Sequence, residues 1–159
     1  MKASVRLCAV ALLSLGILAP PKSEAAAFSK VAQNTESFYF QLVYGSNADA
    51  PPTRDAKRIG PKLRKRLEHV FQWKYYWEVN RGEFQVREGK TTEIRISDQR
   101  TLEVSLSGND LEIRIYRDGK LMRRNREKRS VNFTLLGGDD GRQQSWFIII
   151  RRDKPSTAE

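Results

Sequence analysis

Residues 83–119 read EFQVREGKTTEIRISDQRTLEVSLSGNDLEIRIYRDG and repeat one short pattern, in which glutamate is followed by an apolar, a polar and an apolar residue. The copies begin at Glu83, Glu93, Glu103 and Glu112, and turn-forming residues separate them. Alternation of this kind is typical of a strand with one buried face. The stretch therefore predicts strands joined by short turns. A solenoid would also repeat, but irregular copies of strand length favour a meander of hairpins.

The apolar positions of the four copies are expected to form the buried faces of these strands. They are Phe84, Val86, Ile94, Ile96, Val104, Leu106, Ile113 and Ile115. The clearest turn signal is Asp118-Gly119, because this dipeptide tolerates the positive φ angles of a type I′ turn. We expect a tight hairpin there.

Four further segments also have strand character. Residues 37–45 and 75–80 alternate with period two, and residues 131–136 place Val131, Phe133 and Leu135 on one face. The segment SWFIIIRR, residues 145–152, is apolar at five consecutive positions. Such a run predicts a central strand that is covered on both faces.

One helix is predicted between these strands, from Pro61 to Gln72. Proline is favoured in the first turn, where its missing N–H is not needed. Apolar residues recur with helical spacing at Leu63, Leu67, Val70 and Phe71. The preceding loop contains Pro51-Pro52 and other turn formers, which exclude regular structure there.

Together these elements predict a single α+β domain at residues 37–153. We expect an antiparallel β-rich domain of about eight or nine strands, meander or sandwich-like, with one amphipathic helix packed on the sheet. A pure β-sandwich with an appended helix is the close alternative. Residues 28–36 are expected to form a flexible lead, and residues 154–159 a disordered tail.

The first 27 residues have the pattern of a cleaved secretory signal peptide. Lys2 and Arg6 precede an apolar run, and small residues allow cleavage after Ala25 or Ala27. The run is shorter than the roughly 20 residues of a spanning helix. Cys8 would leave with the signal, so no disulfide is expected. We expect an exported protein, periplasmic or extracellular, with no transmembrane span in the mature chain.

Residues suited to catalysis or metal binding are few. His69 is the only histidine, and no Gly-x-Ser-x-Gly segment accompanies it. Asp139 and Asp140 lie among glycines, where a polar turn is favoured over a calcium loop. Glu78, Glu83 and Glu93 are candidates for a glycan hydrolase only through abundance. The sequence therefore predicts a protein that is not an enzyme, with no metal and no cofactor.

Two basic clusters are the candidate binding residues in a chain of net charge +10. The first lies in a segment expected to be a loop or a frayed edge: Arg123, Arg124, Arg126, Lys128 and Arg129. The second crowds the helix N-terminus, where the macrodipole disfavours cations by about 0.3–1 kcal/mol each: Lys62, Arg64, Lys65 and Arg66. A bound anion would relieve that conflict, whereas a solvated face that keeps the protein soluble is the plainer interpretation.

The chain resembles a group of small signal-bearing bacterial proteins with no described function. The resemblance covers about residues 38–155. It is carried by Gly60-Pro61-Lys62-Leu63, by Phe71 with Trp73-Lys74 and Tyr76-Trp77, and by Gly137-Gly138 before Trp146-Phe147. It implies an exported β-rich domain and supplies no activity, cofactor or site residue.

These observations favour a non-enzymatic extracytoplasmic binding or accessory domain, an assembly or protein-interaction component of the cell envelope that uses a basic surface. The alternative is a general binder of anionic polymers, either polysaccharide or nucleic acid, with nucleic acid less favoured because no recognition motif is present. A small glycan-acting hydrolase is the third class. The identity of the partner and the oligomeric state stay open.

Overall fold

The strands form two antiparallel sheets, which the computed structural model describes for residues 34–141 and 143–156. The predicted signal peptide, residues 28–33 of the lead and residues 157–159 of the tail lie outside the described residues. The elements are β1 (Thr35–Ser46), β2 (Lys57–Arg58), α1 (Pro61–Glu68), β3 (Tyr75–Arg87), β4 (Thr91–Arg95), β5 (Arg100–Ser107), β6 (Asp110–Arg117), β7 (Lys120–Lys128), β8 (Phe133–Asp139) and β9 (Gln144–Arg151).

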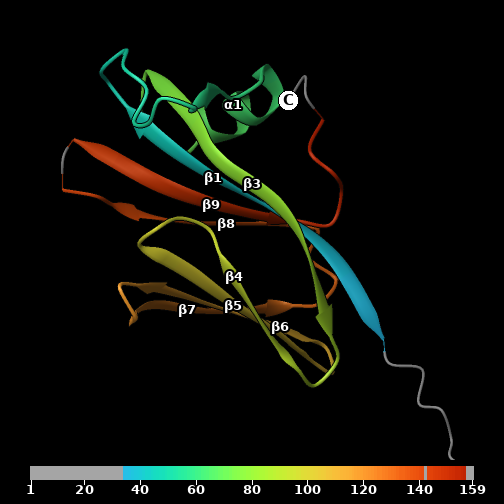
Figure 1. Cartoon of the computed structure of the whole chain (residues 1–159). Coiled ribbons are helices and arrows are strands. Elements are labelled where there is room, and N and C mark those ends of the chain that lie inside the picture. Colours follow the sequence, from blue (N-terminus) through green and yellow to red (C-terminus); the bar gives the residue numbers. More distant parts are fainter. Residues whose placement is uncertain (1–33, 142, 157–159) are drawn as a thin grey trace, which may run out of the picture. The chain divides into compact units, whose positions relative to one another are not determined.

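The first sheet has the strand order β2-β3-β1-β9-β8, and the second sheet has the order β4-β5-β6-β7. The predicted fold class, a β-rich α+β domain with one helix, is confirmed (Figure 1). The predicted meander of hairpins accounts for the second sheet. The copy of the repeat that begins at Glu83 belongs elsewhere, because it forms the end of the long strand β3 and pairs with β1 in the first sheet.

The two sheets face each other across the main core. Apolar side chains alternate out of both sheets into this space, as the period of two requires. Phe38 and Phe84, which are cross-strand partners in the first sheet, stack with ring centroids 5.6 Å apart. Val104, Leu106 and the other apolar repeat residues of β5 and β6 face them from the second sheet, while Ile94 of β4 is only partly buried.

The helix α1 packs on the other face of the first sheet, so this sheet is the middle of three layers (Figure 1). The strand β9 shows the arrangement directly. Ile148 and Ile150 enter the core between the sheets, whereas Phe147 and Ile149 pack with Leu63 of α1. The prediction that the segment SWFIIIRR is a central strand covered on both faces is confirmed.

The helix is shorter than predicted and ends at Glu68 rather than Gln72. The amides of Val70 and Phe71 both donate hydrogen bonds to the Leu67 carbonyl, which closes the last turn. Val70 is 66% exposed, so its predicted place on the apolar stripe is wrong. Phe71 lies outside the helix but still packs on Phe147, with ring centroids 4.4 Å apart.

The predicted turn and the predicted ends of the domain can be compared with the structure. Asp118 and Gly119 have φ angles of 50° and 75°, which confirms the predicted tight hairpin between β6 and β7. Residues Thr35 and Glu36, expected in the flexible lead, belong to β1. Pro155 is buried, so packed chain extends into the segment that was expected to be disordered. No helix in the described residues has the length and apolar character needed to cross a membrane.

Candidate functional site

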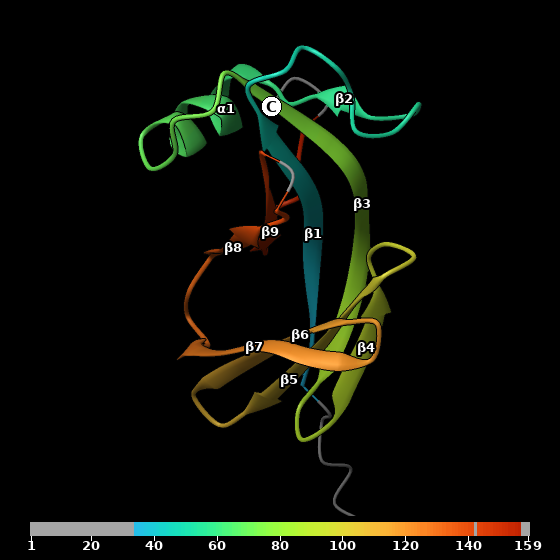
Figure 2. The same cartoon turned by 90° about the vertical axis from the view of Figure 1, so that its left-hand side faces the viewer.

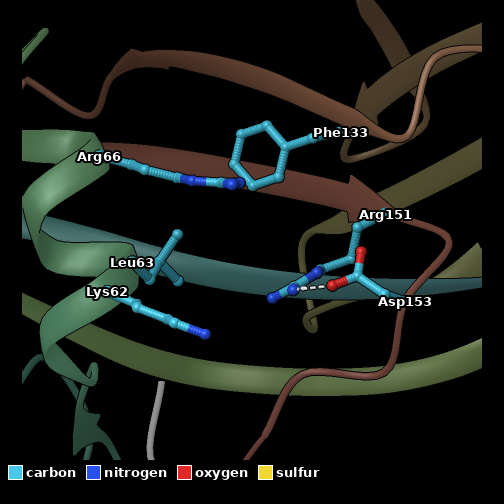
Figure 3. Close-up of a pocket in the computed structure, with 6 residues that line it drawn as sticks. All are labelled: Lys62, Leu63, Arg66, Phe133, Arg151 and Asp153. Atoms are coloured by element: carbon cyan, nitrogen blue, oxygen red, sulfur yellow. Dashed lines mark hydrogen bonds and ion pairs between the residues drawn. The ribbon is translucent and has the colours of Figure 1, made fainter.

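A pocket of about 250 Å³ lies where the N-terminal half of α1 meets the outer face of the first sheet. We call it the helix pocket, and it is lined by Lys62, Leu63, Arg66, Phe133, Arg151 and Asp153 (Figure 3). Three of the six lining side chains are cationic and one is acidic. The pocket is therefore a concentration of positive charge in a chain that is already basic.

The helix supplies two of the cations through its period. Lys62 and Arg66 are four residues apart, so they project from the same side of α1. Leu63, which is buried, anchors that turn of the helix to the sheet. Both cationic side chains extend from α1 into the same space (Figure 3).

The first sheet supplies the third cation through the period of its strands. Arg151 follows Phe147 and Ile149 at intervals of two on β9, so its side chain lies on the face that carries α1. Its cross-strand neighbours are Phe133 on β8 and Tyr39 on β1. Arg151 is only 7% exposed, which places one charge of the pocket largely out of water.

The carboxylate of Asp153 partly balances this charge. It accepts a hydrogen bond from Arg151 (Figure 3), and this bond holds the pKa of Asp153 below its ordinary value, with a smaller contribution from the charge of Arg66. The guanidinium of Arg66 lies 4.8 Å from the ring centroid of Phe133, close enough for a cation–π interaction. The lining thus combines three cations with one acid.

This combination can hold an anionic group. Guanidinium groups match the planar geometry of carboxylate and the oxygen arrangement of phosphate, and the lysine ammonium adds a further donor. The contact with Phe133 helps to hold the Arg66 guanidinium at the pocket. Leu63 and Phe133 provide apolar walls beside the charges. The site is thus suited to a negatively charged group attached to a less polar body.

The predicted basic cluster of the helix is divided by the structure. Lys62 and Arg66 line the helix pocket. Arg64 instead donates a hydrogen bond of 2.6 Å to Glu68 one turn later, and Lys65 is exposed and does not line the pocket. Only half of that cluster therefore contributes to one site.

The other predicted cluster, residues 123–129, was expected in a loop or a frayed edge. Most of the segment belongs to β7, the exposed edge strand of the second sheet, so the loop is wrong and the position at an exposed edge is confirmed. Arg124 and Arg126 both donate hydrogen bonds to Glu112 on the neighbouring strand. Together with Arg114, and with Arg124 contributing most, they lower the pKa of Glu112 to about 2. The strand forms because these cross-strand ion pairs compensate for its lack of apolar alternation.

Two of the three remaining bases of this cluster also have partners. Arg129 forms ion pairs with Glu36 and Glu88, and Arg123 donates a hydrogen bond of 2.9 Å to the Gly137 carbonyl. Lys128, the last residue of β7, is exposed. The two predicted clusters do not combine, because β7 is in the second sheet and α1 covers the opposite face of the first.

The residues considered for catalysis and metal binding have other roles or are simply exposed. Asp140 binds the guanidinium groups of Arg100 and Arg117, and Asp139 accepts a hydrogen bond from the Gly141 amide. Within the described ranges, no group of three or more acidic, histidine or cysteine side chains is placed to hold a metal ion.

His69 ends the helix and is exposed. Glu78 is buried and accepts a hydrogen bond of 2.6 Å from Gln41, while Glu83 and Glu93 are exposed on β3 and β4. Glu78 and Glu83 belong to the first sheet, whereas Glu93 belongs to the second. They form no site comparable to the helix pocket.

Sequence reasoning missed the part of the helix pocket that comes from the first sheet and the segment after it. Arg151 directly follows the apolar run of residues 146–150, and Asp153 lies two residues further on. Neither residue was therefore part of a predicted basic cluster. The signal that could have found Arg151 was its position in the alternation of β9, because it continues the same face as Phe147 and Ile149.

Comparisons with family models, with curated proteins and with solved structures find no match for this chain.

Proposed function

We propose that this chain is an exported, non-enzymatic binding domain of the cell envelope that holds an anionic group of its partner in the helix pocket. The observation that carries the proposal is the convergence of Lys62, Arg66 and the buried Arg151 on one space, against the single carboxylate of Asp153. Export rests on the signal-like pattern of the first 27 residues.

Recognition suits this site better than chemistry does. The lining side chains are cations, one carboxylate and two apolar groups, which is a set that attracts and orients an anion. Because Arg151 is mostly out of water, its attraction for an anion is screened less than that of an exposed arginine. The occupant that this chemistry suits is a carboxylate or phosphate group on an envelope protein.

A general binder of anionic polymers is the second candidate. It is favoured by the net charge of +10 and by the exposed bases on α1 and β7, which lie outside the helix pocket. Such binding would weaken log-linearly as salt rises and would differ little between polyanions. A partner held in one pocket would instead depend on a few residues and persist near physiological salt.

The test is capture of partners from an envelope extract by the chain lacking residues 1–27, at low and at roughly physiological salt, with nuclease-treated controls. The double variant Lys62→Gln with Arg66→Gln empties the helix side of the pocket of charge. The double variant Lys65→Gln with Lys74→Gln removes the same charge from exposed positions outside it.

We expect a discrete protein to be captured at physiological salt, lost with the first variant and kept with the second. Equal losses with both variants, together with release of only glycan or nucleic acid as salt rises, would support the polymer binder. Undiminished capture by the first variant would refute a role for the helix pocket.

A further inference from the structure

Strand β7 is the most exposed long strand of the domain. It forms one edge of the second sheet, and Figure 2 shows it in orange at the front of the view. Across its nine residues, all of which the structure describes, no side chain is buried. An edge strand carries a row of backbone N–H and C=O groups that face away from its neighbour. Among the described strands, only β6 pairs with it.

Two apolar side chains are exposed on this edge. Leu121 is 48% exposed and Met122 is 54% exposed, and the one other large apolar side chain that is exposed in the described residues is Val70. The register of β6 with β7 shifts at Met122, since Tyr116 faces Leu121 whereas Ile115 faces Arg123. Met122 is thus the extra residue of a bulge, a feature that redirects a side chain.

A second pocket, of about 340 Å³, lies beside this bulge, and we call it the edge pocket. Met122 and Arg123 line it from β7, Ile115 from β6 and Trp146 from β9. Arg100, Arg117 and Asp139 add charged groups to the lining, and Gly137 and Gly138 of β8 complete it. The edge pocket thus offers an apolar side chain the surfaces of Ile115, Met122 and Trp146 beside the edge strand.

The position of β7 is fixed by polar contacts with β8. Arg123 donates a hydrogen bond of 2.9 Å to the Gly137 carbonyl, and the Thr134 hydroxyl donates one of 2.5 Å to Glu127. In both contacts the β7 partner is a side chain, and β7 remains the last strand of its sheet. A fixed edge costs a binding partner less ordering entropy than a mobile loop would.

Charge decides what can bind along this edge. Arg124 and Arg126 remain more than half exposed although both contact Glu112. A second copy of β7 placed against the first would bring arginines next to arginines, which is unfavourable. A strand that carries carboxylates would meet opposite charges instead.

We propose that β7 is a docking edge for an extended acidic segment of a partner protein. The segment adds a strand to the second sheet, its carboxylates meet Arg124 and Arg126, and one of its apolar side chains enters the edge pocket. This surface is separate from the helix pocket, and the inference does not depend on the function proposed for that pocket.

The test uses an acetylated nine-residue peptide that alternates glutamate with valine, with affinity measured by titration calorimetry. Two further peptides carry backbone N-methyl groups either on every glutamate or on every valine. If the peptide pairs with β7 through one of its two backbone edges, only one of the two methylation patterns blocks the hydrogen bonds. The peptide with that pattern should lose at least about tenfold in affinity. Hydrogen exchange of the amides of residues 120–128 should slow when the unmethylated peptide binds.

Protein variants localise the site. Met122→Ser should weaken peptide binding several-fold because its apolar contact lies at the edge pocket, whereas Val70→Ser, at the other exposed apolar residue, should leave it unchanged. The pair Lys62→Gln and Arg66→Gln should also leave it unchanged, which separates this surface from the helix pocket.

Absence of binding, equal affinities of the two methylated peptides, or equal effects of Met122→Ser and Val70→Ser would each overturn the proposal. Dimerisation of the free protein that protects the same amides would overturn it too, because a second copy would then be the occupant.

Discussion

Arg100 of β5 donates a hydrogen bond of 2.8 Å to Asp140, the residue that follows β8, and so joins the second sheet to the first. Its other terminal nitrogen donates one of 2.7 Å to the Tyr44 hydroxyl on β1. The guanidinium lies 5.2 Å from the ring of Trp146, and Arg100 is only 3% exposed. One buried charge at the start of β5 therefore contacts β1, β9 and the residue that follows β8 in the first sheet.

Replacing Arg100 with leucine should destabilise the protein strongly. The change leaves Asp140 with only Arg117 and removes the partner of the Tyr44 hydroxyl, and breaking a largely buried pair costs about 3 kcal/mol. Urea denaturation of the two proteins measures the difference in free energy of unfolding.

The exposed pair of Arg95 and Asp98 gives the control, because its nitrogen–oxygen distance of 3.1 Å is similar but both side chains are in water. Arg95→Leu should leave the unfolding midpoint unchanged. Equal shifts for the two arginine variants would show that Arg100 stabilises through size rather than through its buried pair.

The pH dependence of stability should reveal Glu112. Its pKa is lowered in the folded protein from its ordinary value near 4.5 to about 2, so its ionised form stabilises the fold above pH 4.5 and this contribution is lost as pH falls toward 2. At neutral pH, Glu112→Gln should cost about 1–2 kcal/mol, since the partner arginines are partly screened by water.

Urea midpoints of the wild type and of Glu112→Gln, measured from pH 7 down to pH 2, test this expectation. The two curves should converge as the wild-type carboxylate becomes protonated. A difference that stays constant over the whole range would show that the ion pairs of Glu112 do not stabilise the fold.

Most strands of this fold could be predicted from periodicity. The two-residue strand β2 could not, because it lies in the segment that was expected to be a loop, and that prediction is wrong there. The strands β7 and β3 show what periodicity does not detect. The strand β7 places Arg123, Asn125 and Glu127 on the side facing β8, so it has no apolar alternation to detect. The strand β3 was predicted as two separate strands because Gly82 interrupts the alternation of apolar and polar residues. A Cβ at Gly82 would lie 2.5 Å from the Phe40 ring, so glycine serves close packing there rather than a turn.

The candidate site was predictable only in part, because it depends on a contact between distant segments. Lys62 and Arg66 share one side of a helix, which their spacing shows. Their meeting with Arg151 follows from the packing of α1 on β9, and sequence periodicity gives no information about which face of a strand a helix will cover. Cross-strand ion pairs such as those of Glu112 are equally invisible until strand order is known.

Arg66→Lys should separate charge from shape in the helix pocket. Lysine keeps the positive charge, but it lacks the guanidinium that contacts Phe133 and cannot present two parallel donors to a carboxylate. We expect several-fold weaker partner capture than in the wild type, with unchanged thermal stability. The quantity of partner retained at physiological salt is the measurement, and retention equal to that of the wild type would indicate that charge alone suffices.

Leu67→Ala should loosen the helix and with it the helix pocket. Leu67 is fully buried between α1 and the first sheet, and loss of such a side chain costs roughly 2–5 kcal/mol. Because α1 is short and lies on the outer layer, hydrogen exchange should accelerate in residues 61–68 more than in β5 and β6. Val70→Ala removes a similar volume three residues later from an exposed position and should change neither exchange nor stability. Uniform acceleration in both sheets would mean instead that the helix and the two sheets unfold as one unit.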